Sequence, residues 1–435
     1  MKSYRLAELS HEFLKELCWR NPIADPSVMK TCRSIFDDVS RLGDEAIREC
    51  TRRFDGVDLT ELRVSSQEFS QAKEGVSSPA VKALERAAQN IRKFHAAQQF
   101  SEEPVEVEPG VRCWREARAI ESVGLYVPGG NAVLPSTVLM LGIPARLAGC
   151  RGIQLCVPPR QDGTVSPEVL LAAQITGLSQ VFKIGGAQAI AAMALGTETV
   201  PRVDKIVGPG NRWVQTAKLL AVLKGVAIDM VAGPTEVLVI ADDSASPQLI
   251  ASDLISQAEH GSDSRAILVS TSREVLKEVI QLVEHQVQDL PRRDFASKAL
   301  GGSFALLAQS MDAAFDFANL YAPEHLILHL EAPRRWMKQV QSAGSVFLGA
   351  WSPEVAGDYA SGTNHTLPTS GLAQAFSGVS LDTFVKKITF QELTQKGLRE
   401  LAPTLEVLAE LEGLEGHRRA VRARLGDRGP LTADN

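Results

Sequence analysis

Amide, imidazole and carboxylate side chains recur in the second half of the sequence at spacings that suit metal binding and acid–base chemistry. Gln257 and His260 are three positions apart in the segment DLISQAEHG, so in a helix they lie on one face of its last turn. Their amide oxygen and imidazole nitrogen are candidate metal ligands. The alternative is that His260 caps the last carbonyl groups of this helix and interacts favourably with its dipole.

Glu324 and His325 are adjacent in the segment NLYAPEHLIL. On a regular strand they would point to opposite faces, but Pro323 just before them indicates a turn, in which both can face one cavity. An imidazole that titrates near neutrality beside a carboxylate suits general base catalysis. The alternative is a solvated start of a strand.

Asp358 and His365 lie in the segment GDYASGTNHTLPT, which we expect to be a glycine-rich loop after a strand. Loops on a rigid scaffold commonly carry binding and catalytic residues, so both are candidate site residues. The alternative for Asp358 is an Asx-turn, in which its carboxylate bonds to the nearby backbone.

Glu412 and His417 occur in the segment ELEGLEGHRRAV. A spacing of five does not place two side chains on one helical face, but the two intervening glycines predict a turn between them. The alternative for His417 is a core or capping histidine, because it shares a helical stripe with Val421 and Leu425.

Together, these segments offer nitrogen and oxygen donors for one mixed metal site. The candidate ligands are Gln257, His260, Asp358 and His417. Such a donor set suits zinc or manganese. A thiolate zinc site is not expected, because none of the six cysteines forms a C-x-x-C pair. Sequence spacing does not show that the four segments meet.

Three glycine clusters stand where a strand is expected to end and a helix to start. They are in the segments GLYVPGGN, KIGGAQA and VGPGNR. The free backbone N–H groups of a helix N-terminus suit phosphate, and ligands of open α/β sheets bind beyond the carboxyl ends of the strands. No cluster has the G-x-G-x-x-G pattern, so tight turns remain the alternative. Three clusters this close together favour a cofactor cleft.

The elements that must carry these residues alternate between short apolar runs and helices. Residues 121–240 repeat an apolar run, a glycine cluster and a helix, and residues 246–330 continue in the same style. This alternation predicts parallel sheets flanked by helices, with strands buried on both faces. Residues 1–120 are expected to be mostly helical, and the chain turns helical again from about residue 392.

The composition excludes two classes of partner. Lys and Arg number 46 against 52 Asp and Glu, a formal net charge of −6, so no basic surplus attracts nucleic acid or anionic membranes. The sequence contains no run of about 18 apolar residues, so we expect no membrane-spanning helix. The first twenty residues carry charges throughout, which argues against a secretory signal. With few cysteines as well, a reducing compartment is expected, the cytoplasm or an organelle stroma, and we expect a cytoplasmic protein.

Eight motifs resemble those of the histidinol dehydrogenase family and stand in the family's order. They are GLYVPGGNAVLPSTVLMLGIPARLAGC, IGGAQAIAA, VDKIVGPGNRWVQTAK, AGPTEVLVIAD, DLISQAEHG, YAPEHL, GDYASGTNHTLPT and SGVSLDTFVKKITFQELT. The resemblance covers about residues 30–425. It implies a two-step, NAD-dependent oxidation of L-histidinol through L-histidinal to L-histidine, the last step of histidine biosynthesis, with a bound zinc.

The same resemblance implies roles for individual residues. The implied metal ligands are Gln257, His260, Asp358 and His417, and the implied catalytic pair is Glu324 and His325. The implied substrate contacts are these six residues together with Thr235, His365 and Glu412. Thr235 stands where the family commonly has serine, and it keeps the hydroxyl group. The implied NAD contacts are Tyr126, Gln188 and Asn211.

The resemblance also implies two incomplete Rossmann-like parallel-sheet domains, a helical N-terminal region and a small helical C-terminal domain. Residues 1–120 would form the N-terminal region and lead into the first α/β domain, which residues 236–385 continue with the metal and catalytic residues. Residues 121–235 would form the second domain, on the NAD side. Residues 386–435 would form the C-terminal domain and cross to the partner in a homodimer with shared active sites.

Two alternatives remain at this stage. One is a paralogous zinc- and NAD-dependent dehydrogenase of another small alcohol, against which Glu412 and His417 argue. The other is a catalytically silent scaffold or binding protein, which the complete set of base and ligand residues disfavours.

Overall fold

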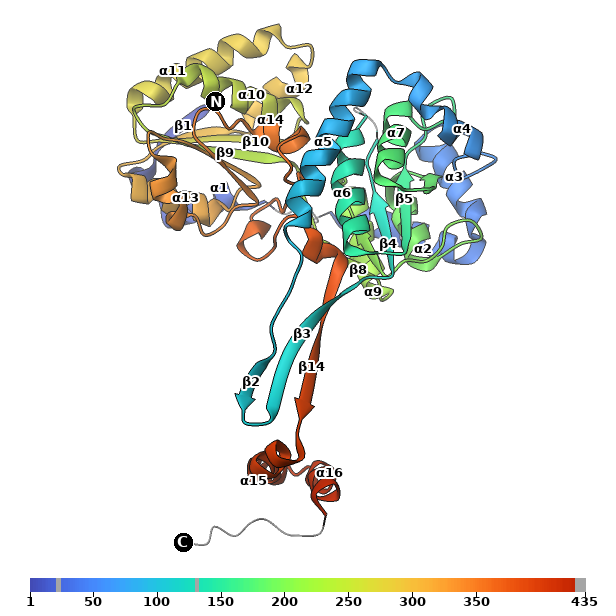
Figure 1. The fold of residues 1–435 in the computed structure, drawn as a ribbon. Helices are drawn as coiled ribbons and strands as arrows, with labels where there is room; N and C mark the ends of the chain where they lie inside the picture. The colour runs from blue at the N-terminus through green and yellow to red at the C-terminus, as the bar shows by residue number, and fades with distance from the viewer. Residues whose placement is uncertain (21–24, 130–132, 427–435) are drawn as a thin grey trace. The chain divides into compact units, whose positions relative to one another are not determined.

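The structure, a computed structural model, describes residues 1–20, 25–129 and 133–426 (Figure 1). It divides into two compact units. The first unit is Met1–Gln98 with Ile120–Phe384, and the second is Gln99–Ala119 with Val385–Asn435. Gly130 and Asn131 of the first glycine cluster, and the last nine residues of the predicted C-terminal domain, lie outside the described residues.

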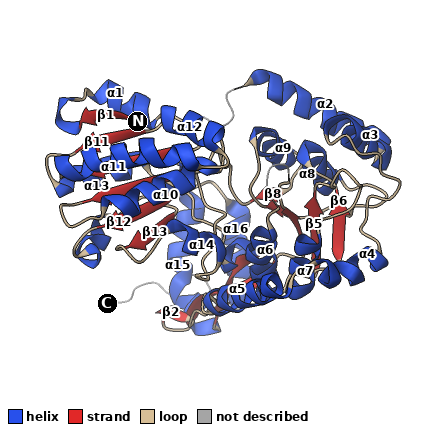
Figure 2. Cartoon of the chain, turned by 90° about the horizontal axis from the view of Figure 1, so that it is seen from above, coloured by secondary structure: helices blue, strands red, loops and turns tan. Residues whose placement is uncertain are grey.

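A six-stranded sheet organises one half of the first unit (Figure 2). Its strands, in spatial order, are β1 (Lys2–Arg5), β11 (Phe304–Leu307), β10 (Arg265–Ser270), β9 (Glu236–Ala241), β12 (His325–His329) and β13 (Ser345–Leu348). All neighbouring strands are parallel, which confirms the predicted sheet type. The expectation of helix at the start of the chain is wrong for β1. This short edge strand carries charged, exposed residues, so it has no apolar run to reveal it.

Helices cover both faces of this sheet. One core contains Val237 and Val239 of β9, together with α10 (Pro247–Glu259), α11 (Arg273–Gln286) and α12 (Arg293–Gly301). The other contains Leu238 and Ile240, together with α1 (His11–Cys18) and α13 (Met311–Tyr321). Every residue of β9 is therefore buried, as expected for a central parallel strand. A short helix, α14 (Glu354–Tyr359), follows β13.

A second parallel sheet organises the other half of the first unit. Its strands, in spatial order, are β6 (Gln180–Lys183), β5 (Gly152–Val157), β4 (Ser122–Tyr126), β7 (Lys205–Val207) and β8 (Ala227–Ile228). The helices of one face are α2 (Pro26–Leu42), α3 (Asp44–Phe54), α8 (Gly186–Leu195) and α9 (Arg212–Leu223). Those of the other are α4 (Ser66–Gln71), α5 (Ser78–Ala96), α6 (Pro135–Ala148) and α7 (Pro167–Thr176).

The strand order of this second sheet reverses at β4. The chain adds β5 and β6 on one side of β4 and then returns to add β7 and β8 on the other. Such a switch point opens a crevice at the carboxyl ends of the strands, where α/β folds bind nucleotides. Tyr126 is the last residue of β4, and Gly208 is the first residue after β7. The two backbones are so close here that a Cβ on Gly208 would stand 2.1 Å from the Tyr126 carbonyl oxygen.

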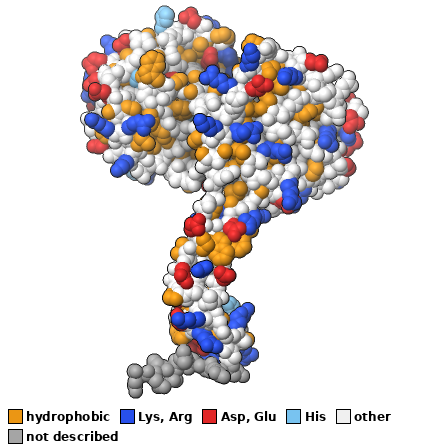
Figure 3. All heavy atoms as spheres, in the orientation of Figure 1, with side chains coloured by type: hydrophobic (Ala, Val, Ile, Leu, Met, Phe, Trp, Pro, Cys, Tyr) orange, Lys and Arg blue, Asp and Glu red, His pale blue; other side chains and the backbone are white. Residues whose placement is uncertain are grey.

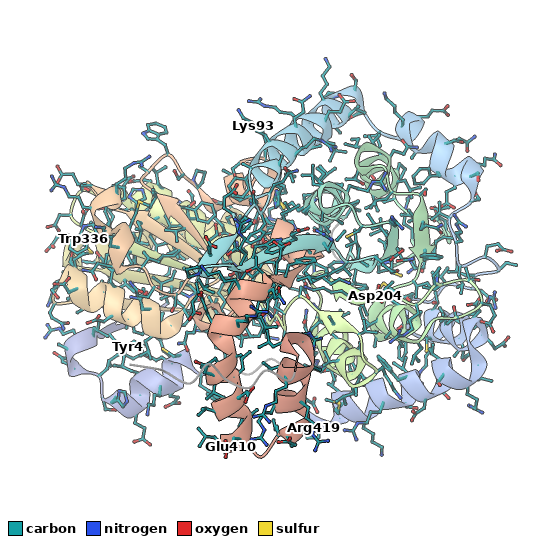
Figure 4. All side chains as sticks on the ribbon, turned by 60° about the horizontal axis from the view of Figure 1, so that its bottom comes forward. Tyr4, Lys93, Asp204, Trp336, Glu410 and Arg419 are labelled. Atoms are coloured by element: carbon teal, nitrogen blue, oxygen red, sulfur yellow. The ribbon has the colours of Figure 1, made fainter. Side chains whose placement is uncertain are left out.

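The second unit is an antiparallel sheet followed by two helices. It consists of β2 (Val105–Glu108), β3 (Val111–Ala119), β14 (Val385–Leu393), α15 (Gln395–Leu411) and α16 (Glu415–Leu425). β3 pairs with β14 over its whole length. Glu410 and Arg419 mark the two helices in Figure 4. The bounds of these helices and the turn at residues 412–413 confirm the predicted helical end and the turn before His417. The division of the chain into four parts, predicted from the sequence, stays a prediction.

Acidic and basic side chains are interspersed over the face of the molecule drawn in Figure 3, without a broad surface of one sign. Among the described residues, no helix is both long and apolar enough to cross a membrane.

Candidate active site

The amino ends of two neighbouring strands bring the predicted catalytic residues together. Thr235 directly precedes β9, Glu324 directly precedes β12, and His325 is the first residue of β12. The two strands are paired in register, with His325 opposite Val237. The C-terminal end of α10 also reaches this site. Gln257 in its last turn bonds to Thr235, and His260, the C-terminal cap of the helix, lies near Asp358.

The Thr235 hydroxyl links the predicted metal ligand Gln257 to the predicted catalytic carboxylate. It donates a hydrogen bond of 2.6 Å to Glu324 Oε2 and accepts one of 2.8 Å from Gln257 Nε2. Glu324 Oε2 also accepts the backbone N–H of Glu236 at 2.9 Å. Thr235 therefore uses the hydroxyl that it shares with serine, and it turns the Gln257 oxygen away from itself.

The hydrogen bond of His325 defines its tautomer. Nδ1 lies 3.1 Å from the Glu236 carbonyl oxygen, and a carbonyl can only accept, so Nδ1 carries the proton. In the neutral ring Nε2 is then free to accept a proton. Burial lowers the pKa of His325 to about 3, which keeps the ring neutral.

Three carboxylates surround the His325 ring. Its Nδ1 is 3.7 Å from Glu324 Oε2 and 3.5 Å from Glu354 Oε1, and its Nε2 is 3.7 Å from Asp358 Oδ1. Burial raises the pKa of Glu324 and that of Glu354 well above their ordinary values, and it raises the pKa of Asp358 to about 6. Negative charge is therefore costly here unless a cation or a bound proton offsets it.

The expectation that Asp358 lies in a loop is wrong, because Asp358 belongs to the last turn of α14. Glu354 is four positions earlier, in the first turn of the same helix, so both carboxylates share one helical face. Sequence reasoning missed Glu354 because a loop has no such periodicity. Recognising the helix is what would have revealed it.

Donor atoms in this site fit a divalent cation. Nitrogen and oxygen atoms of His260, Glu354 and Asp358 lie within 4.8 Å of one another, and His260 Nε2 is 3.8 Å from Asp358 Oδ2. Gln257 is fully buried, and its Oε1 has no hydrogen-bond partner among the described residues. A buried amide oxygen without a donor suits a metal ligand. Partial desolvation of the 43%-exposed His260 side chain, together with the charge of Arg292, lowers the pKa of His260, and neutral imidazole is the form that binds metals.

His365 connects this site to the second half of the first unit. Its Nδ1 lies 3.0 Å from the carbonyl oxygen of Asp358, and its Nε2 lies 2.9 Å from the hydroxyl of Thr137 on α6. Since the carbonyl accepts, Nδ1 is protonated and Nε2 accepts from Thr137. Burial lowers the pKa of His365 to about 4. A buried, neutral His365 therefore helps to hold α14 and the loop after it.

The two remaining predicted substrate and metal residues belong to the second unit. Glu412 is the C-terminal cap of α15, and His417 lies in α16. Both side chains are exposed, so His417 is not a core histidine of this chain.

The three predicted NAD contacts lie around the switch point of the second sheet. The Tyr126 hydroxyl accepts the N–H of Gly186 at 3.0 Å. Gln188, at the start of α8, is buried. Asn211 caps α9 through Oδ1, which accepts from Trp213 N at 3.0 Å and Val214 N at 3.2 Å. A cleft of about 630 Å³ opens at the carboxyl ends of β4 and β5.

Known proteins match this chain over nearly its whole length. The family model described as histidinol dehydrogenase matches residues 19–425. A histidinol dehydrogenase from Bacteroides fragilis is 51% identical over 410 residues, which cover 94% of this chain and 96% of that relative. A chloroplastic histidinol dehydrogenase from Arabidopsis thaliana is 50% identical over 98% of this chain and 92% of its own length.

Solved structures include one that matches the whole fold. The crystal structure of histidinol dehydrogenase from Elizabethkingia anophelis superposes with a TM-score of 0.94 at 49% identity, covering 98% of each chain. By family model, sequence identity and fold, the chain belongs to the histidinol dehydrogenase family of oxidoreductases of histidine biosynthesis.

Proposed function

We propose that the protein oxidises L-histidinol to L-histidine through L-histidinal, with each of the two steps reducing one NAD. The observation that carries the proposal is the Glu324–His325 pair beside the donor atoms of Gln257, His260 and Asp358. The alcohol first loses a hydride and a proton, and the aldehyde then takes up water and loses a second hydride. One histidinol, two NAD and one water thus give one histidinate, two NADH and three protons.

His325 is the base of the first step in this proposal. Its Nε2 is the unprotonated nitrogen, so it can take the hydroxyl proton of the substrate. Glu354 and Glu324 lie close to Nδ1, where negative charge would stabilise the imidazolium ring that forms. The Glu236 carbonyl keeps the ring in the orientation that this transfer needs.

Glu324 is the residue that activates water for the second step. The Thr235 hydroxyl and the Glu236 N–H both donate to its Oε2, and these bonds favour the carboxylate against the opposing effect of burial. Oε1 then remains to accept a proton from water as water adds to the aldehyde. The buried site also limits escape of the reactive amino-aldehyde.

Gln257, His260 and Asp358 would hold the metal in the first unit, with His417 as the fourth ligand. This set of donor atoms suits zinc or manganese. The metal, when bound, would hold the imidazole and amino nitrogens of the substrate and so orient its alcohol carbon. Glu412 and His365 complete the substrate contacts that we propose. Tyr126, Gln188 and Asn211 would contact NAD.

We also propose a homodimer in which the second unit of each chain completes the site of its partner. Supporting this, α15 and the turn after it expose four apolar side chains. These are Val407, Leu408, Leu411 and Leu414, which are 57%, 51%, 78% and 40% exposed. Exposed apolar groups of this kind are typical of association surfaces. All six cysteines are free, which is consistent with the cytoplasmic location that we propose.

The decisive experiment measures NADH and histidine when a limiting amount of L-histidinol has been consumed. We expect two NADH per histidine, and no turnover of other small alcohols at comparable concentration. A ratio of one with histidinal accumulating would reject the two-step reaction. Faster oxidation of another small alcohol would favour the paralogous dehydrogenase instead.

A further inference from the structure

Asp55 places a carboxylate in the cleft at the carboxyl ends of β4 and β5. It is the C-terminal cap of α3 and a partly buried residue of the cleft wall. Its Oδ2 lies 3.4 Å from Nε2 of Gln188, one of the proposed NAD contacts. Its charge also contributes to the raised pKa of Tyr126, another proposed contact. Asp55 therefore lies among the residues proposed to contact NAD.

The Asp55 carboxylate lacks a cationic partner among the described residues. Its neighbour Arg52 pairs with Glu49 and Asp58 instead. Arg160 also lines the cleft, but its guanidinium lies 4.0 Å from Asp162. Burial raises the pKa of Asp55 to about 6, so the carboxylate is still mainly ionised at neutral pH. It can accept hydrogen bonds from a ligand without first breaking an ion pair.

Apolar side chains line the same cleft. Phe54, which is 49% exposed, Val157 and Pro158 belong to its wall. An apolar wall next to an unpaired carboxylate matches a nucleoside, whose base is flat and whose ribose carries two adjacent hydroxyl donors. In other dinucleotide-binding folds, the carboxylate of an Asp or Glu accepts a hydrogen bond from the ribose 2′-hydroxyl.

We propose that Asp55 accepts the 2′-hydroxyl of the adenosine ribose and thereby selects NAD against its 2′-phosphorylated form, NADP. The proposal rests on the function proposed above, in which Gln188, the hydrogen-bond partner of Asp55, contacts NAD. A 2′-phosphate would replace the hydroxyl donor and would place a charge of about −2 next to the Asp55 carboxylate. Selection would then come from one lost hydrogen bond and one added repulsion.

Direct binding of the reduced dinucleotides to the full-length protein tests this without catalysis. We would titrate the wild-type protein and Asp55→Asn with NADH and with NADPH, in the absence of histidinol, and follow nucleotide fluorescence. The wild-type protein should bind NADH at least tenfold more tightly than NADPH. In Asp55→Asn this preference should fall by about tenfold or more, the scale of one hydrogen bond to a charged group.

Asp58→Asn is the matched control. It removes the same charge three positions away, from an exposed carboxylate that pairs with Arg52 and does not line the cleft. Its NADH to NADPH preference should stay within about twofold of the wild-type value. An equal change in both variants would assign the effect to net charge and overturn the role of Asp55.

A second measurement keeps the test valid if Asp55→Asn does not fold. The wild-type protein should bind 2′-deoxy-NAD at least tenfold more weakly than NAD, because the hydroxyl that Asp55 accepts is missing. Equal binding of these two ligands would overturn the proposal, as would an unchanged NADH preference in a folded Asp55→Asn. A wild-type protein that binds no dinucleotide at all would instead refute the proposed function.

Discussion

The Thr235 hydroxyl lies between Gln257 and Glu324, and its hydrogen bonds determine how both side chains are oriented. By donating to the carboxylate, it must accept from the amide N–H₂. The amide oxygen is thereby left without a donor. A single threonine thus orients one proposed catalytic group and one proposed metal ligand, so the two proposed functions share one hydrogen-bond chain.

Glu324→Gln and His325→Asn should impair different half-reactions. Loss of Glu324 should slow histidinal oxidation more than histidinol oxidation, and loss of His325 should do the reverse. Each main effect should be about 10²–10⁴-fold, the usual contribution of one general base. Single-turnover NADH formation, started from histidinol or from histidinal, separates the two steps.

His329→Asn is the control for the histidine variant. His329 is buried on the same strand but at its other end, opposite Ala241, so both half-reactions should keep their rates within about threefold. Equal losses on both half-reactions in Glu324→Gln and His325→Asn would contradict the proposed division of roles.

Metal removal should affect stability as well as activity. Without a cation, the carboxylates of Glu354 and Asp358 face each other, and the Asp358 charge contributes to the raised pKa of Glu354. A chelator should therefore abolish activity and lower the melting temperature, and zinc or manganese should restore both. In Asp358→Asn the chelator should change the melting temperature much less. Full activity in a sample that elemental analysis shows to be metal-free would refute the metal site.

Among the secondary-structure elements, α9 presents one buried face to the loops around the switch point. Gln215 donates to the Gly210 carbonyl at 3.2 Å and accepts the Ala232 N–H at 3.1 Å. One turn later, Lys218 donates to the Gly208 carbonyl at 3.0 Å and pairs with Asp229. The loop that ends at Asn211 is therefore fixed to the segment that leads to Thr235.

Lys218→Met should destabilise the protein by about 3–5 kcal/mol, because it leaves the Asp229 carboxylate buried and unpaired. The double variant Lys218→Met/Asp229→Leu should regain part of this loss, since no buried charge remains. Lys205→Met is the control, because the ammonium of Lys205 bonds to the Thr383 carbonyl, and the Asp229 carboxylate, which also interacts with the Lys205 charge, keeps its ion pair with Lys218. Urea unfolding measures all three, and a wild-type free energy of unfolding in Lys218→Met would contradict the argument.

Sequence patterns predicted the βα units well, because glycine and apolar periodicity are local properties. α7 and α10, for example, begin with proline directly after Ser166 and Ser246, and proline is favoured at the first position of a helix. The location of the proposed catalytic pair was harder to predict from the sequence. It lies at the amino ends of β9 and β12, whereas the usual rule for α/β folds favours carboxyl ends. Which ends of which strands meet depends on strand order, and strand order is not a local property of sequence.

Over the whole molecule, the proposed metal ligands are divided between the two units. Gln257, His260 and Asp358 belong to the first unit and His417 to the second. The second unit contains both its helices and the β3–β14 pair, so a variant in α16 leaves the sheets of the first unit unaltered. Lesions can therefore be placed in one unit at a time.

Complementation between two inactive variants tests whether each site uses two chains. His260→Asn and His417→Asn should each be nearly inactive, because each loses one proposed ligand. If they are unfolded together and refolded in equal amounts, about half of the dimers contain one chain of each kind, by random pairing. When the second unit serves the partner, one site of a mixed dimer collects both lesions and the other collects none. Recovered activity should then be about a quarter of the wild-type value, by two-fold symmetry.

A second unit that folds back onto its own chain predicts a different recovered activity. If the second unit serves its own chain, every site in every mixed dimer keeps one lesion, and mixing restores nothing. Refolding each variant alone controls for losses on refolding, and differently tagged chains confirm that mixed dimers form. With mixed dimers present, absence of recovery would reject the shared site but would leave the residue roles intact. A recovery near a quarter would require His417 to act on the partner chain, since no other pairing of the lesions leaves an undamaged site.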